Sequence, residues 1–495
     1  MYIYVLIFLL TFILYWYIDR RKSFRVLEDY GYRVPPVNLL FGNLLQLVQD
    51  DLGTMERWME EYGEEIGEKG GKIMGWYRGP SPAIWTTSPE FLKEVFIKDA
   101  ETFIDRPMLD RSDNIPHLIN MKGMTWKRAR STLAPTFSAA KMKKMSGIMG
   151  TTVDTMIDIL RSKIEKAEII DFNEVYQRLT LDTIGQCALA MNVNCQRDPE
   201  DRFLKMVRAA LDRQIDTTVI ISSCFPAVEK IIAWIFSRRG RKRTNQVIIE
   251  KCREVLKARR ANPPNPPPVD ALQLCMDAAG TDGKLSEDEI VAHEFIFILA
   301  GYETTAAALN FTTYLLAKHP EIQSKLQQEI DRKFSKDMKV NYDNVTELEY
   351  LDMVLSESMR VYPPIPLHIG RWASQERTIC GKTIPQGAGV LAATWILHHH
   401  PGFWKDPWKF DPERFSTENR DKIVEMTYMP FGDGPRNCIG RRFALMEAKM
   451  ALVEVFRQFT VSVCESTPNP LPVRNKGLTL AVVGDKLHLR AKRRD

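Results

Sequence analysis

A short loop near the end of the chain presents one cysteine beside a predicted helix. Residues 431–440 read Phe-Gly-Asp-Gly-Pro-Arg-Asn-Cys-Ile-Gly, and a helix is expected from Arg441 onward. Gly432 and Gly434 permit backbone angles that other residues avoid, so amide groups can turn toward the sulfur of Cys438. The unpaired N–H groups and the positive dipole end of a helix N-terminus lower the pKa of a thiol. The loop therefore favours a thiolate that serves as a metal ligand.

We interpret Cys438 as a candidate ligand for a haem iron. A thiolate on haem iron must stay ionised, rigid and shielded from water, because its electron donation favours cleavage of the O–O bond. Phe431 can shield the sulfur, and Arg436 can meet a haem propionate. The alternative is a turn with a buried structural cysteine, the usual state of a lone intracellular Cys. The loop by itself leaves that alternative open.

The spacing of the whole loop resembles the cytochrome P450 signature, Phe-x-x-Gly-x-Arg-x-Cys-x-Gly, which is a specific motif. The resemblance implies a fold that is mainly α with small β-sheets, built as a single large haem domain behind an N-terminal transmembrane anchor. It implies haem b (iron protoporphyrin IX) as the cofactor and Cys438 as the ligand of its iron. From the loop it assigns to haem binding Phe431, Gly432, Arg436, Cys438 and Gly440.

A second motif lies inside a predicted long helix. Ser286 and Glu289 form a capping box, which places the start of the helix at this point. Residues 300–305 read Ala-Gly-Tyr-Glu-Thr-Thr and resemble the oxygen-activating helix of the same family. Thr304 can hydrogen-bond the carbonyl at position 300 and present its hydroxyl to bound oxygen, and Glu303 can pass protons inward from water. These two residues are the predicted catalytic groups.

The small residues of this motif, Ala300 and Gly301, leave a gap where ligands can lie over a flat cofactor. In isolation, such a helical motif is more often a packing contact beside a surface carboxylate. Joined to the cysteine loop, it favours oxygen activation. Family members that only rearrange peroxides commonly alter the acid and threonine pair.

Three further residues are candidates for contact with the haem propionates. Trp126 and Arg130 are four residues apart, so they share one helix face and resemble the propionate-binding Trp-x-x-x-Arg helix of the family. The alternative is an ordinary amphipathic helix. Arg371, which follows a proline-rich turn, matches another propionate-binding position of the family.

A structural ion-pair group is also expected. Glu357 and Arg360 are three residues apart on one helix face, and their apolar neighbours predict a buried setting. Arg414 resembles the family arginine that completes this pair into a triad supporting the cysteine loop. We assign these three residues to the scaffold and not to catalysis.

The N-terminus is predicted to anchor the protein in a membrane. Residues 1–18 are almost wholly apolar and are followed directly by Asp19 and three basic residues. This length is at the short end of the roughly 17–25 residues that span a bilayer. The positions of the charges and the absence of a small-residue cleavage site favour an uncleaved signal anchor, with the rest of the chain facing the cytosol. The predicted organisation is an anchor at 1–18, a basic and proline-containing hinge at 19–40, and a catalytic haem domain at 41–495.

The composition excludes some functions. Lys and Arg number 68 against 63 Asp and Glu, a net charge of +5 that is too mild to predict nucleic-acid binding. The eight cysteines show no CxxC or other zinc-ligand spacing, which indicates reduced thiols and no disulfide framework.

Helical periodicity dominates residues 141–260 and 286–360, and short strand-like runs occur at 83–87, 389–395 and 478–483. Residues 261–268 are rich in proline and are predicted to link two helices. An apolar stretch at 231–236, after Phe225, precedes a basic run at 237–243 and is too short to span a bilayer. It is either a core helix or an interfacial helix, and the membrane-dipping region of the family favours the second.

The resemblance implies a monooxygenase that inserts one oxygen atom of O2 into a lipophilic steroid, fatty acid or xenobiotic. Electrons come from NADPH through a flavoprotein reductase, NADPH-cytochrome P450 reductase, with cytochrome b5 as a further partner and the endoplasmic reticulum membrane as the location. The motifs most resemble the drug- and steroid-oxidising and thromboxane-synthase branch. The alternatives are a peroxide-rearranging isomerase of the same fold and a non-enzymatic haem-binding membrane protein.

The resemblance also predicts where substrate and reductase bind. The pocket is expected to involve residues 106–117, the region of Phe225, residues 297–304 and residues 364–369. A basic docking face for an acidic reductase is expected on the cysteine side, from Lys127, Arg128, Lys141, Lys143, Lys144, Arg441, Arg442 and Lys449.

Overall fold

The computed structural model describes residues 2–494 except residues 108–114, 190, 192, 199, 212–219, 222–223, 226–243, 283–284, 336 and 368. The apolar stretch at 231–236 and the basic run at 237–243 lie outside the described residues. The prediction of an interfacial helix there therefore remains a prediction.

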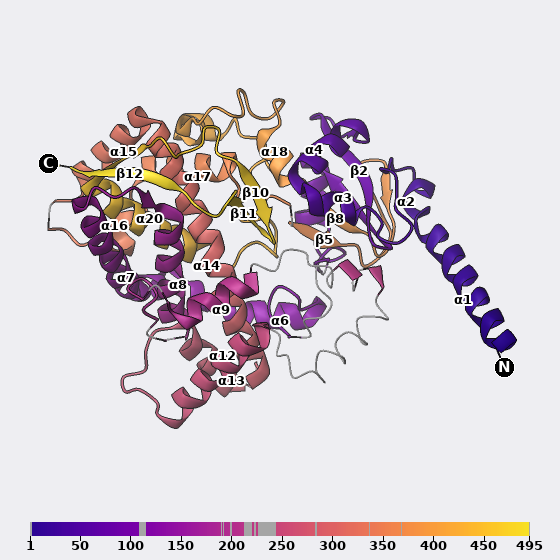
Figure 1. Cartoon of the computed structure of the whole chain (residues 1–495), viewed down its shortest axis with the longest axis horizontal. Coiled ribbons are helices and arrows are strands. Elements are labelled where there is room, and N and C mark those ends of the chain that lie inside the picture. Colours follow the sequence, from indigo (N-terminus) through magenta and orange to yellow (C-terminus); the bar gives the residue numbers. More distant parts are fainter. Residues whose placement is uncertain are drawn as a thin grey trace.

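Helices form most of the molecule and gather on one side of it, as Figure 1 shows. The longer ones are α4 (Asp51–Glu61), α6 (Gly123–Leu133), α7 (Ala139–Glu165), α8 (Phe172–Leu189), α9 (Arg202–Leu211), α12 (Thr244–Ala261), α13 (Ala271–Asp282), α14 (Glu287–Lys318), α15 (Pro320–Lys333), α17 (Glu349–Val361) and α20 (Arg441–Gln458). Short helices are α2 (Val26–Asp29), α3 (Leu44–Gln49), α5 (Pro89–Lys93), α16 (Tyr342–Thr346), α18 (Thr394–His399) and α19 (Thr417–Arg420).

A five-stranded sheet forms the smaller side of the molecule, next to α2, α3 and α4 (Figure 1). Its order is β1 (Glu64–Ile66), β2 (Gly71–Arg78), β3 (Ser81–Thr86), β8 (Gly389–Ala392) and β5 (Gly370–Trp372), and only the β3–β8 pair is parallel. A three-stranded sheet has the order β4 (Ile170–Asp171), β12 (His488–Arg493) and β9 (Phe459–Val463). One two-stranded sheet consists of β10 (Val473–Lys476) and β11 (Thr479–Val482), and another of β6 (Arg377–Ile379) and β7 (Lys382–Ile384). The predicted class, mainly α with small sheets, is confirmed.

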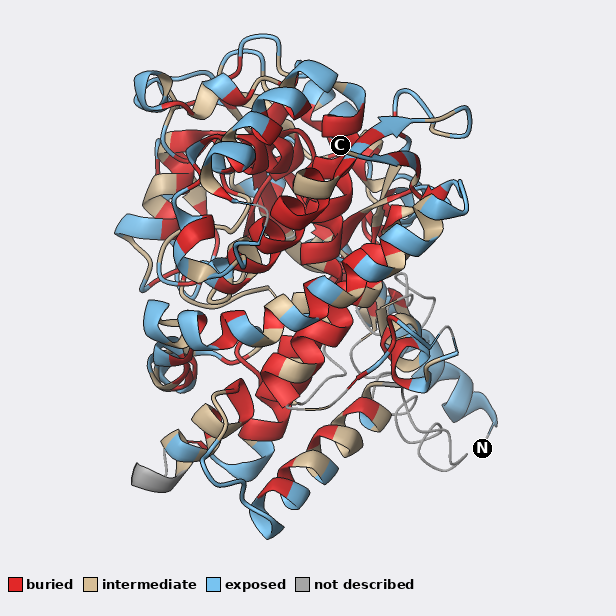
Figure 2. Ribbon diagram, turned by 90° about the vertical axis from the view of Figure 1, so that its left-hand side faces the viewer, coloured by how far each residue is buried: buried red, intermediate tan, exposed pale blue. Residues whose placement is uncertain are grey.

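Two hydrophobic cores correspond to these two sides. The larger one lies among α7, α8, α14, α17 and α20, and the smaller one packs against the five-stranded sheet. Figure 2 shows buried residues at the centre of the helical side and exposed residues on the outer faces of the surrounding helices. The helical side thus surrounds α14 with buried, mostly apolar side chains.

The predicted elements are largely present. The capping box of Ser286 and Glu289 begins α14, and the proline-rich linker separates the end of α12 at Ala261 from the start of α13 at Ala271. One strand prediction was too long: β8 ends at Ala392, and Trp395 belongs to α18. The apolar run at 389–395 fits a buried strand and a buried helix equally well, since its residues are buried in both elements.

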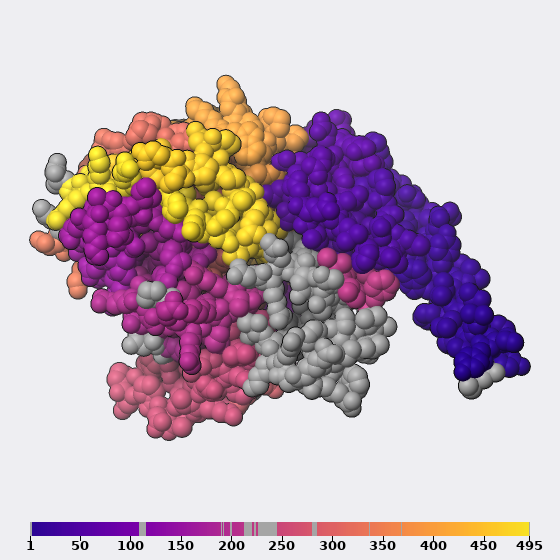
Figure 3. Space-filling model, viewed as in Figure 1, coloured from indigo at the N-terminus to yellow at the C-terminus, as the bar shows by residue number. Residues whose placement is uncertain are grey.

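The N-terminal helix α1 (Tyr2–Ser23) projects from the body of the molecule (Figures 1 and 3). Among the described residues it is the one helix long and apolar enough to cross a membrane, and its apolar window is not buried. At its end, the Arg20 guanidinium donates to the carbonyl of Cys224 at 2.6 Å and lies 5.4 Å from the ring of Phe225. These contacts hold the base of α1 against the globular part. The domain boundaries at 18 and 40 remain predictions, and the helix itself continues through the basic residues to Ser23.

Candidate active site

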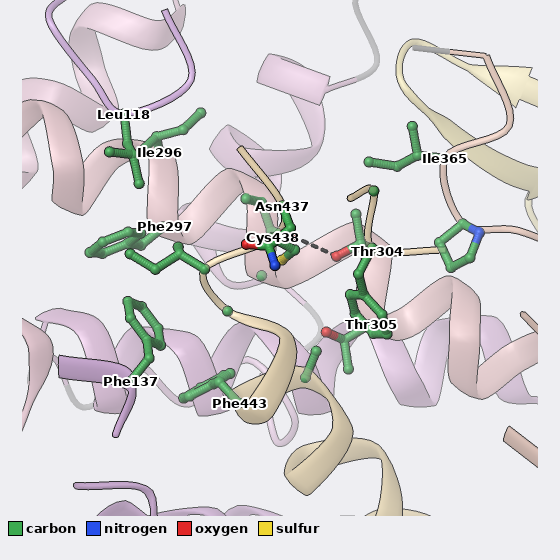
Figure 4. A pocket seen from close by; sticks show the side chains of 18 of the residues that line it. Leu118, Phe137, Ile296, Phe297, Thr304, Thr305, Ile365, Asn437, Cys438 and Phe443 are labelled. Carbon is green, nitrogen blue, oxygen red and sulfur yellow. Dashed lines mark hydrogen bonds between the residues drawn. The ribbon is translucent and has the colours of Figure 1, made fainter. Parts of the chain in front are cut away.

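A cavity of about 260 Å³ lies between α14, α6 and the loop that carries Cys438. Figure 4 shows the side chains of Cys438, Thr304 and Ile365 around this space. Its walls are mostly apolar and include Leu118, Phe137, Ile296, Phe297, Ile365 and Phe443. Residues from the predicted segments 297–304 and 364–369 therefore line it. Phe225 does not, because it stacks on Trp16 with ring centroids 6.3 Å apart.

The cysteine loop owes its shape to its glycines. Gly432 and Gly434 have φ angles of +66° and +70°, as their positions in the motif predict. A β-carbon on Gly434 would lie 1.8 Å from the carbonyl oxygen of Phe96, so no other residue fits there. The backbone N–H of Cys438 donates to the carbonyl of Phe431 at 2.9 Å, which closes the loop just before α20.

Cys438 is packed among protein atoms but keeps exposed surface, which borders the main cavity. Burial raises the pKa of the Cys438 thiol, and the Gly440 amide and the charges of Arg106, Arg130 and Arg441 act in the opposite direction. The lowering effect predicted from the helix N-terminus is therefore present but is outweighed by burial. A coordinated metal ion removes the proton from such a thiol outright.

Opposite the sulfur, α14 exposes one turn to the cavity. Ala300, Gly301 and Thr304 line the cavity, although this part of the helix is otherwise mostly buried. The Thr304 hydroxyl donates to the carbonyl of Ala300 at 2.6 Å, which is the hydrogen bond predicted from the motif. A β-carbon on Gly301 would lie 2.9 Å from the side chain of Ile184, so glycine lets α8 approach α14 here.

Glu303 faces a different space. Its carboxylate accepts a 2.8 Å hydrogen bond from the Thr479 hydroxyl and lies 3.8 Å from the ammonium of Lys476. Glu303 does not line the main cavity but a small second one, although its predicted partner Thr304 lines the main cavity. Adjacent helix residues point about 100° apart, which explains the difference.

Four arginines border the main cavity, namely Arg106, Arg130, Arg371 and Arg436. The Nε of Arg106 is buried without a hydrogen-bond partner in the described part of the chain. Burial, together with the charges of Arg106 and Arg436, holds the pKa of Arg371 well below its usual range. Buried, mutually repelling cations are costly without a counter-charge. The cavity therefore fits a ligand that carries carboxylates.

The guanidinium of Arg436 forms most of its hydrogen bonds with backbone carbonyls of the protein. Its guanidinium donates to the carbonyls of Ile104 (2.7 Å), Leu118 (3.1 Å) and Met121 (2.6 Å) and stacks 4.1 Å from the Trp126 ring. Burial is the main cause that lowers its pKa to about 9. Arg436 thus ties the segment before α6 to the cysteine loop, and a propionate contact remains a prediction.

The other predicted arginines also hold the cysteine loop. Arg130 donates to the backbone carbonyl of Asn437 at 3.0 Å and to its side chain at 2.8 Å. Arg371 on β5 donates to the carbonyl of Asp433 at 2.8 Å and lies 4.2 Å from the Phe96 ring. Trp126 and Arg130 share one face of α6, as predicted, since both line the main cavity.

Arg106 is the site residue that motif reasoning missed. The sequence placed it only at the edge of a pocket segment, without a role. Its Nη2 donates to the carbonyl of Arg436 at 2.7 Å, so it lies beside the cysteine loop. No local sequence pattern predicts this contact, because the two residues are 330 positions apart.

The predicted scaffold triad is present. Arg360 donates from Nε and Nη2 to Glu357 at 2.7 and 2.8 Å, and Arg414 Nε lies 3.3 Å from the same carboxylate. Glu357 and Arg360 are fully buried. The backbone N–H of Asp411 also donates to the Glu357 carboxylate at 3.0 Å. This hydrogen bond ties the segment that carries Arg414 to α17.

The predicted docking face needs one correction. Lys449 is buried and pairs with Asp352 at 2.7 Å, so it cannot belong to an exposed basic surface. The helical pattern of α20 places Lys449 on its inner side, where its ammonium also donates to the carbonyl of Val345 at 3.2 Å.

Comparisons with known proteins agree with this geometry. The family described as Cytochrome P450 matches residues 33–489. The chain is 36% identical over 422 residues to Cytochrome P450 3A12 of Canis lupus familiaris, covering 83% of each chain. It is 34% identical over 476 residues to Cytochrome P450 3A18 of Rattus norvegicus, covering 94% of each chain. It is also 34% identical over 447 residues to Cytochrome P450 3A56 of Fundulus heteroclitus, covering 86% of this chain and 88% of that relative.

Proposed function

Because the chain belongs to the cytochrome P450 family, and is thereby a haem-thiolate monooxygenase, we propose that it oxidises lipophilic small molecules with electrons from NADPH. The net reaction is RH + O2 + 2 e⁻ + 2 H⁺ → ROH + H2O. The observation that carries this proposal is one cavity that brings together Cys438, the Thr304 hydroxyl and apolar walls.

Haem is the cofactor of the family, and the residues of the main cavity fit it. Cys438 provides the sulfur ligand, and the four arginines provide positive charge for two propionates. When bound, haem supplies O2 binding and cleavage of the O–O bond, for which a thiolate ligand is suited. We assign propionate binding to Arg106, Arg130, Arg371 and Trp126, with Arg436 as the residue that holds the loop beside them.

The chain's own residues perform three tasks in this reaction. Phe431, Gly432, Gly440 and Ala300 line the cavity next to the cysteine and the exposed turn of α14, where they would contact a bound haem and limit the access of water. The Thr304 hydroxyl lies at the cavity wall, where its hydrogen bond to the carbonyl of Ala300 fixes its position. The lone pairs of Oγ1 remain able to accept a proton or a hydrogen bond. Glu303, on the next face of α14, is the proposed source of protons for this threonine.

The apolar lining supports a lipophilic substrate. Phe137, Ile296, Phe297 and Ile365 offer no polar group to orient a charged molecule. Steroids, fatty acids and xenobiotics are the proposed classes, because burial of apolar surface provides their binding energy.

Electrons are proposed to arrive from NADPH-cytochrome P450 reductase, with cytochrome b5 as a second partner. The exposed basic residues Arg441 and Arg442 lie at the start of α20, on the cysteine side. Such positive charge steers an acidic partner toward the loop. The apolar helix α1 supports attachment to the endoplasmic reticulum membrane with the catalytic part in the cytosol.

The test is reconstitution of the purified haem protein with the reductase, NADPH and a panel of steroids, fatty acids and plant toxins. The expected result is a product that carries one atom from isotopically labelled O2 and forms only with NADPH. Turnover of a lipid hydroperoxide without NADPH would instead identify a peroxide-rearranging isomerase. Absence of product from every class would favour a non-enzymatic haem-binding protein.

A further inference from the structure

A second, small cavity lies behind α14, on the side that Glu303 faces. Its volume of about 10 Å³ accommodates about one water molecule. Its walls come from α8, α14 and the C-terminal hairpin of β10 and β11, and include Asn173, Gln177, Glu303, Asn310, Leu480 and Asp485. The main cavity is lined by a different face of α14, which carries Ala300, Thr304 and Ala308. Glu303 and Thr304, which are adjacent in α14, therefore border two different cavities.

The polarity of this small cavity indicates a bound water. Asn310 is only 3% exposed, and its amide nitrogen donates to Asn173 at 2.7 Å. Its Oδ1 has no hydrogen-bond partner in the described part of the chain. A buried amide oxygen without a partner costs free energy, and a water in the cavity would satisfy it.

Two side chains of the hairpin hold Glu303 in this space. Thr479, at the start of β11, donates its hydroxyl to Glu303 Oε2 at 2.8 Å, and Lys476, at the end of β10, lies 3.8 Å from Oε1. Both hairpin residues are buried, so the carboxylate is shielded from bulk solvent at this point. Glu303 thus has a defined position on the side of α14 away from the main cavity.

The hairpin also connects Glu303 to solvent. Lys476 Nζ lies 3.3 Å from Asp485 Oδ2, whose side chain is about one third exposed, and Arg474 lies 3.1 Å from the same oxygen. Figure 3 shows the C-terminal strands at the surface of the face in view. A continuous polar path therefore runs from the surface at Asp485 through Lys476 to the buried carboxylate.

The same hairpin touches the wall of the main cavity. The backbone N–H of Leu480 donates to the carbonyl of Pro364 at 2.9 Å, and Pro364 lines the main cavity. Thr479 directly precedes Leu480, so the residue that holds Glu303 is adjacent in the chain to this contact.

We propose that Lys476 and Thr479 are positioning residues that keep Glu303 in the small cavity, where it takes up protons from a cavity water. The inference rests on the proposed function, whose reaction consumes two protons per product. In each uptake step, a Glu303 oxygen accepts a proton from the cavity water, and solvent replaces that proton along the path at Asp485. The Glu303 carboxyl then gives that proton to Oγ1 of Thr304, the acceptor that the proposed function assigns to it, and Thr304 releases one proton into the main cavity. Both groups thereby return to their starting protonation states.

The test compares Lys476→Met, which removes the ammonium, with Thr479→Val, which removes only the hydroxyl. Each variant is assayed twice, with NADPH, reductase and O2, and then with hydrogen peroxide alone. The peroxide reaction, RH + H2O2 → ROH + H2O, consumes no protons and no electrons. We expect product per NADPH to fall on the order of tenfold in both variants, while peroxide-driven product stays at the wild-type level. Lys476→Arg and Thr479→Ser should restore most of the coupling.

Lys486→Met is the matched control, because Lys486 is an exposed lysine directly after Asp485. It should leave both reactions unchanged. If the two hairpin variants lose both reactions equally, their role is structural and the inference is overturned. It is equally overturned if they retain full coupling.

A readout without turnover separates this inference from the proposed function. The infrared carboxylate band of Glu303, assigned by difference from Glu303→Gln in the resting protein, should shift in Lys476→Met and in Thr479→Val. A high-resolution crystal structure should show a water bonded to Asn310 Oδ1. An unshifted band would overturn the inference even if the enzyme is active, and absence of wild-type turnover would reject only the proposed function.

Discussion

The Thr304 hydroxyl donates a 2.6 Å hydrogen bond to the carbonyl of Ala300, one turn earlier in α14. Both residues border the main cavity, whereas the neighbouring Glu303 is turned to the small one. The acid and the alcohol of the motif therefore border two separate cavities, on neighbouring faces of α14.

Removal of the Thr304 hydroxyl should disturb oxygen reduction without stopping it. In Thr304→Ala we expect NADPH consumption to continue with more hydrogen peroxide released and less product, because the cavity loses its hydroxyl. Peroxide and product per NADPH are the quantities to measure. Thr304→Ser retains a hydroxyl and should couple nearly normally. Unchanged coupling in the alanine variant would remove the proton role of Thr304.

Replacement of the cysteine ligand has a spectroscopic consequence. In Cys438→Ser the red-shifted Soret band of the ferrous carbon monoxide complex should disappear, because that band requires a thiolate on the iron. Cys464→Ser, which changes a partly exposed cysteine outside the cysteine loop, should retain this band. Persistence of the band in Cys438→Ser would place the ligand elsewhere.

Arg106 should contribute to haem retention. Arg106→Gln removes a partly buried guanidinium beside the cysteine loop. Loss of one charge-assisted hydrogen bond to a haem propionate, about 1.5–3 kcal/mol, corresponds to a roughly tenfold to hundredfold faster loss of haem. Transfer of haem to apomyoglobin measures this rate. Arg253→Gln, on the surface of α12, is the control, since Arg253 forms an exposed ion pair with Asp288 at 3.0 Å. Equal rates in the two variants would exclude the role.

The buried triad should be essential for stability. Arg360→Met leaves the carboxylate of Glu357 buried without its main partner, and we expect a loss of roughly 3–5 kcal/mol in the free energy of unfolding. Denaturant unfolding measures this loss. Lys325→Met breaks the half-exposed pair with Glu413 and should cost at most about 1 kcal/mol. A similar, small effect in both variants would contradict the assignment of Arg360 to the scaffold.

A buried carboxyl of α20 should make stability depend on pH. Burial raises the pKa of Glu447 well above its ordinary value of 4.5, so the folded protein keeps this group protonated where the unfolded chain ionises it. Its contribution is fully present below pH 4.5 and is lost as pH rises toward the folded pKa. Glu447→Gln should therefore raise the melting temperature near neutral pH and have little effect in acid. The exposed Glu349→Gln should show no such pH-dependent difference.

The local chemistry of the site follows from the sequence alone. The positive φ angles of Gly432 and Gly434, the capping box at Ser286, and the hydrogen bond from Thr304 to Ala300 all involve residues within a few positions of each other. Such features depend on backbone sterics and helix periodicity, which a short stretch of sequence contains in full. Because these motifs also identify the family, they predict the overall fold as well.

Only the tertiary structure decided which distant groups meet. Arg106 reaches the cysteine loop across 330 residues, Thr479 reaches Glu303 across 176, and Lys449 turns inward to Asp352. These contacts depend on how helices and the C-terminal hairpin pack around α14, because packing brings together side chains that share no local pattern. Short motifs thus determine the chemical identity of the site, whereas long-range packing determines its charge balance and the surroundings of Glu303.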